Sequence, residues 1–168
     1  MKRPMTPRGY QAMRQELMKL KSMRPEIAKE IEIARGHGDL SENGDYDAAK
    51  EKSGMVEAKI RDFEAKLATA EIIELAKVKD STRVVFGIGV KIEAVETGEA
   101  KSLLIVGADE SDIDKGHVSF ESPLGKALIG KEIGDIAKVA APGGAKEYEI
   151  VEIFIDNSIF EVETEETA

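Results

Sequence analysis

The chain has 168 residues, of which 42% are hydrophobic, and this composition is sufficient to bury a core in one domain or in two small ones. It contains no cysteine and only two histidines, His37 and His117, which excludes disulfides, thiolate metal sites, cysteine nucleophiles and multi-histidine metal sites. The net charge of −9 argues against a protein that binds nucleic acid over its whole surface, and the lack of a secretion signal or of about 18 consecutive apolar residues predicts a cytoplasmic protein without a membrane span.

Two long helical patterns occupy the first 70 residues. Apolar residues spaced three and four apart form one stripe at Tyr10, Met13, Leu17, Leu20, Ile27, Ile31 and Ala34, and a second, unbroken stripe at Tyr46, Ala49, Ser53, Val56, Ile60, Phe63, Leu67 and Ala70. The short segment between them predicts that the helices fold back on each other as an antiparallel coiled-coil hairpin. Each arm of roughly 27 residues would be about 40 Å long, which places the tip, near residues 37–45, far from the rest of the protein.

One proline lies inside the first helical pattern. Pro25 removes a backbone hydrogen bond from a helix interior, at a cost of about 3 kcal/mol. The helix therefore either kinks at this residue or restarts, with Ser22 near the new cap and Glu26 in its first turn. Because the apolar stripe resumes in phase at Ile27, we expect a kink.

The second half of the chain changes to short segments rich in β-branched residues. Strands are predicted for RVVFGIGVKIEAV, KSLLIVG, DIAKVAAP and KEYEIVEIFI, with one short helix that has Ser122 as its cap, Pro123 as its first residue and Gly130 as its stop. The expected fold class is α+β. Its parts are an N-terminal coiled-coil hairpin over residues 1–76, a linker over 77–82, a small antiparallel β-sheet domain over 83–158 and an acidic tail over 159–168.

Charge is distributed unevenly along the chain. Residues 76–168 carry 10 basic and 19 acidic side chains, whereas residues 1–75 carry 14 of each. Within the first half, residues 37–47 hold four acidic residues and no Lys or Arg, at the expected turn of the hairpin. Asp45 and Asp47 are explained by a helix start, because the helix dipole favours acidic residues there.

The other two acids of this turn, Asp39 and Glu42, precede the expected helix start. They lie three residues apart on a glycine-rich turn, a spacing that suits two carboxylates sharing a divalent cation. An EF-hand calcium loop beginning at Asp39 is the alternative, but its twelfth position, which requires a bidentate Glu, is Lys50. An incomplete metal site on a projecting turn suggests instead that a partner supplies the remaining ligands.

Two segments carry a resemblance to a known family. The segment ARGHGDLSENGDYDAAKE in the first half, and FESPLGKALIGKEIGD followed by APGGAKEYEIVEI in the second, are similar to the Gre family of bacterial transcript-cleavage factors, over residues 1 to about 155. The resemblance implies a coiled coil followed by an FKBP-like domain that docks on RNA polymerase. It also implies that the coiled coil enters the secondary channel of a backtracked polymerase and stimulates the polymerase's own cleavage of the nascent RNA 3′ end.

Matched residue by residue, the two essential tip acids of the family fall on Asp39 and Glu42. The resemblance implies that they help to hold a second Mg²⁺ and a water in the polymerase active site, so that one ion activates the water and the other stabilises the leaving oxygen. The protein is then not itself an enzyme. We expect it to bind no metal tightly on its own and to be a monomer.

Contacts with RNA are implied for residues close to the tip. Basic coiled-coil positions serve this role in the family, which makes Arg35, Lys50 and Lys52 candidates, although charged residues on an exposed helix are usually only solvated. Tyr46 begins the second apolar stripe. It therefore either packs within the hairpin or stacks on the RNA end.

Two rival functions follow from the same resemblance. An inhibitor of polymerase with the same fold would carry an altered tip, and the intact pair of Asp39 and Glu42 argues against one. A prolyl isomerase needs an aromatic-lined apolar pocket, whereas the second half has no Trp and few aromatic residues. Ser122 and Pro123 are instead candidates for docking on polymerase, although both already have a sufficient role at a helix start.

Overall fold

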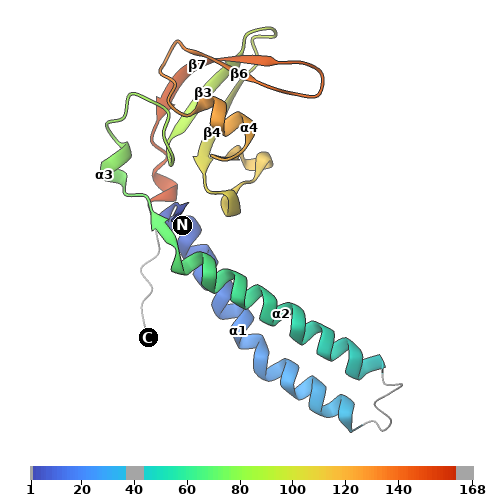
Figure 1. Ribbon diagram of the computed structural model, residues 1–168. Coiled ribbons are helices and arrows are strands. Elements are labelled where there is room, and N and C mark those ends of the chain that lie inside the picture. The colour runs from blue at the N-terminus through green and yellow to red at the C-terminus, as the bar shows by residue number, and fades with distance from the viewer. Residues whose placement is uncertain (1, 37–43, 162–168) are drawn as a thin grey trace. The chain divides into compact units, whose positions relative to one another are not determined.

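A computed structural model describes residues 2–36 and 44–161 of the chain. The chain divides into two compact units (Figure 1). The helical unit comprises Gln11–Thr69, and the β unit comprises Met1–Tyr10 together with Ala70–Ala168. In the described part of the chain, no helix is long and apolar enough to cross a membrane.

The helical unit contains the two expected helices, α1 (Pro7–Arg35) and α2 (Gly44–Ala68), which lie side by side in Figure 1. Their interior is a cluster of Leu20, Ile27, Val56 and Ile60, flanked by half-buried apolar residues. Exposed ion pairs cross between the helices from Lys21 to Glu64, from Arg24 to Glu57 and from Glu30 to Lys52, at 3.1, 2.7 and 3.3 Å. As the residue number increases along α1, the number of the partner residue on α2 decreases, so the hairpin is antiparallel as predicted.

Every residue of the two predicted apolar stripes is buried or half-buried in the structure. Helix α1 continues through Pro25 without a break, which rules out a restart at this residue. The structure therefore keeps Leu20 and Ile27, one on each side of the proline, in the same buried cluster. The helix tolerates the lost hydrogen bond because this buried seam holds both sides of it.

The β unit contains a five-stranded sheet in the order β5-β4-β3-β7-β6. Its strands are β3 (Gly89–Ala94), β4 (Ala100–Val106), β5 (His117–Ser119), β6 (Ile136–Val139) and β7 (Lys146–Phe154). The sheet is mixed, and the expectation of a wholly antiparallel sheet was wrong, because β5 pairs parallel with β4. Between them the chain crosses over through two 3₁₀ turns, η1 (Ala108–Glu110) and η2 (Ile113–Lys115), which return it in the direction of β4.

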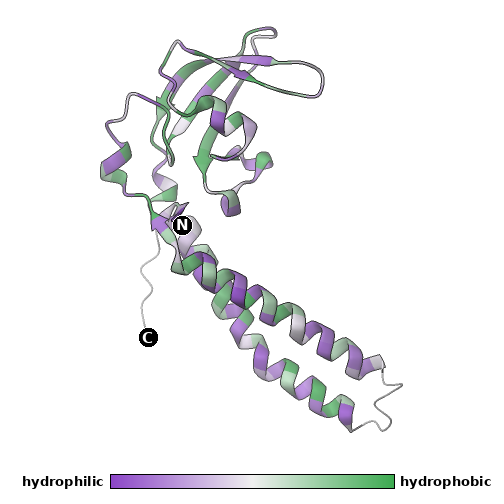
Figure 2. Ribbon diagram, viewed as in Figure 1, coloured by the Kyte–Doolittle hydropathy of each residue, from purple (hydrophilic) through white to green (hydrophobic). Residues whose placement is uncertain are grey.

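Buried side chains of the sheet form two clusters. Because successive residues of a strand face opposite sides, Leu103 and Ile105 of β4 join the main core, whereas Leu104 and Val106 contact Ile159 on the other face. The hydropathy colouring of Figure 2 shows green, hydrophobic segments along the strands of this sheet. Ile159, 3% exposed, follows Asn157 in a final turn, η3 (Asn157–Ile159). The expected boundary of the acidic tail at residue 159 therefore lies too early in the chain, since the Ile159 side chain completes the second cluster.

Two short helices accompany the sheet, so the expectation of a single one was incomplete. Helix α3 (Leu75–Val78) lies at the start of the expected linker, where Val78 is 1% exposed. Helix α4 (Pro123–Leu128) has the predicted signals: the Ser122 hydroxyl accepts a hydrogen bond from the Gly125 N–H at 3.0 Å, and Pro123 is the first helical residue. These local signals suffice to start the helix.

A small parallel sheet joins the N-terminal segment to the chain that follows α2. Strand β1 (Arg3–Met5) pairs with β2 (Ala70–Ile72), and the Ile73 N–H donates to the Met5 carbonyl at 3.0 Å. The compact helical unit is therefore narrower than the range 1–76 expected from the sequence. Both ends of that range pair with each other and belong to the β unit.

Candidate functional site

The predicted tip lies between the end of α1 and the start of α2. Asp39 and Glu42, the two acids matched to the family motif, lie outside the residues that the structure describes. Their flanks are described. Arg35 is the last residue of α1, and the Gly36 N–H donates to the carbonyls of Glu32 and Ile33, while Gly44 begins α2. The segment with both acids therefore joins the ends of two antiparallel helices.

A cluster of one aromatic and two basic side chains lies beside the tip. The half-buried ring of Tyr46, in the first turn of α2, has the Arg35 guanidinium carbon 5.9 Å and the Lys50 Nζ 5.3 Å from its centroid. A hydrogen bond from Arg35, followed by the charge of Lys50, lowers the pKa of the Tyr46 hydroxyl. Such cation–π contacts contribute about 0.5–1 kcal/mol each at exposed sites. Three of the four residues expected near RNA thus lie together. Within this cluster, Tyr46 of α2 contacts Arg35 at the end of α1.

The remaining basic candidate is engaged elsewhere. The Lys52 Nζ lies 3.3 Å from Glu30 on the facing helix, in an exposed ion pair. An exposed pair of this kind contributes at most about 1 kcal/mol, so the lysine is available for exchange with another anion. The structure does not bring Lys52 into the cluster around Tyr46.

The acidic residues at the start of α2 occupy its first turn. Asp45 and Asp47 are both exposed there, where the helix dipole favours negative charge. Over residues 2–36 and 44–161, no three His, Asp or Glu side chains are grouped so that they could hold a metal ion.

The two docking candidates in the β unit differ in their exposure. Ser122 is half-buried, and its hydroxyl donates to the Ser119 carbonyl at 2.6 Å as well as accepting from the Gly125 N–H. Its hydrogen-bonding capacity is thus used within the fold. Pro123 is exposed at the first position of α4, so it offers an apolar surface to a partner.

Comparison with known proteins places both units in one family. Residues 3–72 match the family described as "Transcription elongation factor, N-terminal", and residues 79–154 match that described as "Transcription elongation factor, GreA/GreB, C-term". Together these matches cover most of the chain, including the GDLSEN motif and the segment FESPLGKALIGKEIGD.

Individual relatives are similar over nearly their full length. The chain is 48% identical over 153 residues to Transcription elongation factor GreA of Methylococcus capsulatus, covering 90% of this chain and 97% of that protein. It is 50% identical over 151 residues to the protein of the same name from Pseudomonas aeruginosa, covering 89% and 96%. A crystal structure of the GreA factor homolog 1 protein of Thermus thermophilus matches with 29% identity and a TM-score of 0.42, covering 91% and 99%.

Proposed function

Because the chain belongs to the GreA/GreB family of transcription elongation factors, we propose that it stimulates RNA polymerase to cleave the nascent RNA in a backtracked elongation complex. The observation that carries this proposal is the GDLSEN motif, located between the ends of two long antiparallel helices. Helices of 29 and 25 residues are each about 40 Å long. They are long enough to carry a short acidic turn into a deep channel of a partner.

The proposed chemistry belongs to the polymerase. Asp39 and Glu42 supply two carboxylates that share a second Mg²⁺ with the polymerase active site and orient the attacking water. Two exposed carboxylates bind Mg²⁺ weakly without further ligands, so the metal site is complete only in the complex. The protein acts as a monomer and contributes catalytic groups in trans, without being an enzyme by itself.

The basic cluster beside the tip gives this proposal a contact to RNA. Arg35 and Lys50 present positive charge 5.9 and 5.3 Å from the centre of the Tyr46 ring, on the helix ends that flank the segment with the proposed metal-binding acids. Their charge favours the phosphates of the extruded 3′ end, and it offsets the repulsion between that RNA and the acidic tip. Lys52 adds a more distant positive charge once its pair with Glu30 exchanges.

Docking of the β unit on polymerase is proposed at the start of α4. Pro123 supplies the exposed apolar contact, whereas Ser122 acts by starting the helix. A prolyl isomerase activity is not favoured, because the hollow that the structure shows beside β3 and β7 is lined by lysines, glutamates and a single aromatic residue, Tyr148. The inhibitor alternative is not favoured either, since both tip acids are present.

The test is cleavage of an end-labelled RNA in a stalled, backtracked complex of bacterial RNA polymerase with Mg²⁺. The double variant Asp39→Asn/Glu42→Gln should lower the rate of shortening on the order of 100-fold, since it removes the groups that stabilise the transition state. The matched control is Asp45→Asn/Asp47→Asn, which removes the same charge from the adjacent helix turn and should retain most of the activity. Equal activity of the wild type and the Asp39/Glu42 variant, with both bound to polymerase, would refute the proposed role of the tip.

A further inference from the structure

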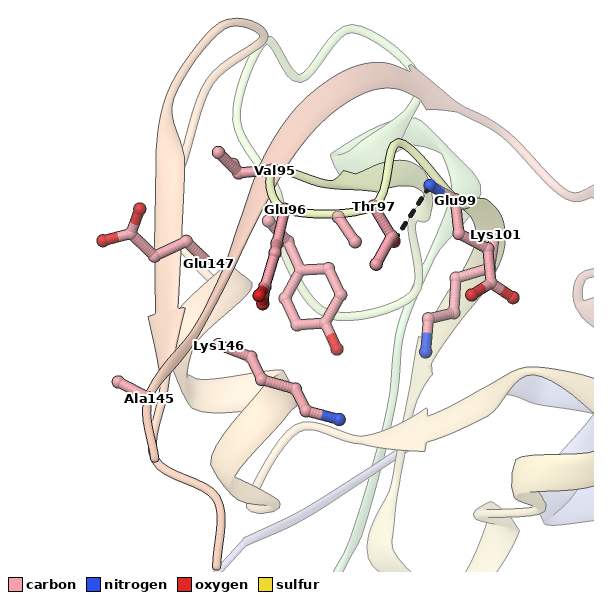
Figure 3. Close-up of a pocket in the computed structure, with 10 residues that line it drawn as sticks. Val95, Glu96, Thr97, Glu99, Lys101, Ala145, Lys146 and Glu147 are labelled. Atoms are coloured by element: carbon pink, nitrogen blue, oxygen red, sulfur yellow. Dashed lines mark hydrogen bonds between the residues drawn. The ribbon is translucent and has the colours of Figure 1, made fainter. Parts of the chain in front are cut away.

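A hollow of about 340 Å³ lies in the β unit, and neither predicted docking residue lines it. It is formed by the turn between β3 and β4 and by the start of β7, and its lining residues are Ala94, Val95, Glu96, Thr97, Glu99, Lys101, Ala145, Lys146, Glu147 and Tyr148 (Figure 3). This volume is at the lower end of the range of about 300–1,000 Å³ that is typical of small-molecule sites. No step of the proposed cleavage mechanism uses these residues.

A largely buried tyrosine, Tyr148, lines the hollow. Tyr148 is only 8% exposed, belongs to the main core and pairs with Ala94 and Ala137 in the sheet. Within the described part of the chain, its hydroxyl makes no hydrogen bond. Among the described residues, no buried side-chain oxygen or nitrogen lacks a hydrogen-bond partner, so the Tyr148 hydroxyl is open to solvent and can donate to a ligand that enters the hollow.

Two lysines, Lys101 and Lys146, line the same hollow. The Lys101 Nζ lies 5.4 Å from the centroid of the Tyr148 ring, and in Figure 3 the side chains of Lys101 and Lys146 both point into the hollow. Among the residues that the structure describes, neither lysine forms an ion pair. This is notable in a half of the chain that has nearly twice as many acidic as basic residues. Two ammonium groups and a hydroxyl, all able to donate a hydrogen bond, thus line one hollow.

Three glutamates also line the hollow and limit what it can bind. Glu147 pairs with Lys138 at 3.7 Å, and its carboxylate points away from the hollow in Figure 3. Glu96 and Glu99 lie on the exposed turn between β3 and β4. The negative charges of Glu96 and Glu99 repel an extended polyanion more than a small anion, because a long chain must also pass close to this turn.

We infer that this hollow binds a small phosphate-bearing ligand through Lys101, Lys146 and the Tyr148 hydroxyl. The two ammonium groups neutralise the phosphate charge, and the Tyr148 hydroxyl donates a hydrogen bond to a phosphate oxygen. Arginine forks are absent from the lining, so recognition is of a point charge rather than of a planar carboxylate. The inference is independent of the proposed cleavage function.

The test is an NMR titration of the isotopically labelled full chain with inorganic pyrophosphate as the probe. Saturable shifts are expected for residues 94–101 and 145–148, and Lys101→Gln/Lys146→Gln should weaken binding at least ~10-fold, as should Tyr148→Phe. The control is Lys79→Gln/Lys126→Gln, which removes two exposed lysines elsewhere in the β unit and should leave the affinity unchanged.

Three outcomes would overturn the inference. The first is the absence of saturable shifts. The second is equal weakening by both double variants, which would indicate general attraction to surface charge. The third is tighter binding of a short single-stranded RNA than of pyrophosphate at the same residues, which would assign the hollow to a polynucleotide. Thermal unfolding by circular dichroism establishes that each variant is folded before its affinity is compared.

Discussion

At the scale of single residues, Glu110 holds the start of α1. Its half-buried carboxylate accepts hydrogen bonds from the Thr6 N–H at 3.2 Å, from the Thr6 hydroxyl and from the Gly107 N–H at 3.0 Å. The Thr6 hydroxyl in turn accepts from the Gly9 N–H at 3.0 Å and so caps the helix. Burial raises the pKa of Glu110 above its ordinary value of 4.5, despite the hydrogen bonds from Thr6 and Gly107 that lower it.

Because the pKa of Glu110 is raised in the folded state, the free energy of unfolding depends on pH. The folded protein binds this proton more tightly than the unfolded chain, so the resulting stabilisation is complete below pH 4.5 and is lost as the pH rises through the raised value. We therefore expect Glu110→Gln to flatten the pH dependence of stability at pH values above 4.5. Urea denaturation of the full chain at several pH values measures this, with Glu121→Gln, an exposed residue, as control. A parallel pH dependence of the wild type and Glu110→Gln would contradict the assignment.

At the scale of elements, two helical glycines have opposite surroundings. A Cβ added at Gly125 in α4 would lie 2.1 Å from the Ser119 carbonyl oxygen and 3.0 Å from the Phe120 Cα. A Cβ added at Gly54, inside α2, would meet nothing within 4 Å. The same substitution therefore has different physical consequences in the two helices.

We expect Gly125→Ala to destabilise the β unit by about 1–3 kcal/mol, because backbone atoms must move to admit the methyl group. Gly54→Ala should stabilise the helical unit by roughly 0.5–1 kcal/mol, because alanine loses less conformational entropy in a helix. Thermal unfolding followed by far-UV circular dichroism and by amide signals of each unit provides the measurement. Destabilisation by both substitutions would show that Gly54 is required for a reason other than its helix propensity.

At the scale of the whole molecule, residues at both ends of the hairpin belong to the β unit. Met5 of β1 is 1% exposed, and Ile60 of α2 is likewise 1% exposed, yet they lie in different compact units. Truncation to Ala should cost about 2–5 kcal/mol at either position. We expect Met5→Ala to lower hydrogen-exchange protection in β1, β2 and their neighbours, and Ile60→Ala to lower it along α1 and α2. Uniform loss of protection in both variants would indicate one cooperative unit instead of two.

Much of the fold was predictable because its signals are local. A period of three to four residues identifies the buried stripes of α1 and α2, and Ser122 with Pro123 marks the start of α4, since each signal lies within a few residues of its effect. The tip acids Asp39 and Glu42 likewise stand out as a motif between two helices, and their role in cleavage stays a proposal.

The tertiary structure alone decided which distant segments meet. The pairing of β1 with β2, the parallel placement of β5 beside β4 and the contact of Glu110 with Thr6 join residues that carry no common sequence signal. The cluster of Arg35 and Tyr46, and the hollow around Tyr148 and Lys101, also combine side chains from separate elements. A sequence determines which local conformations and buried faces are favourable, whereas register, strand order and shared pockets depend on how those faces pack together in three dimensions.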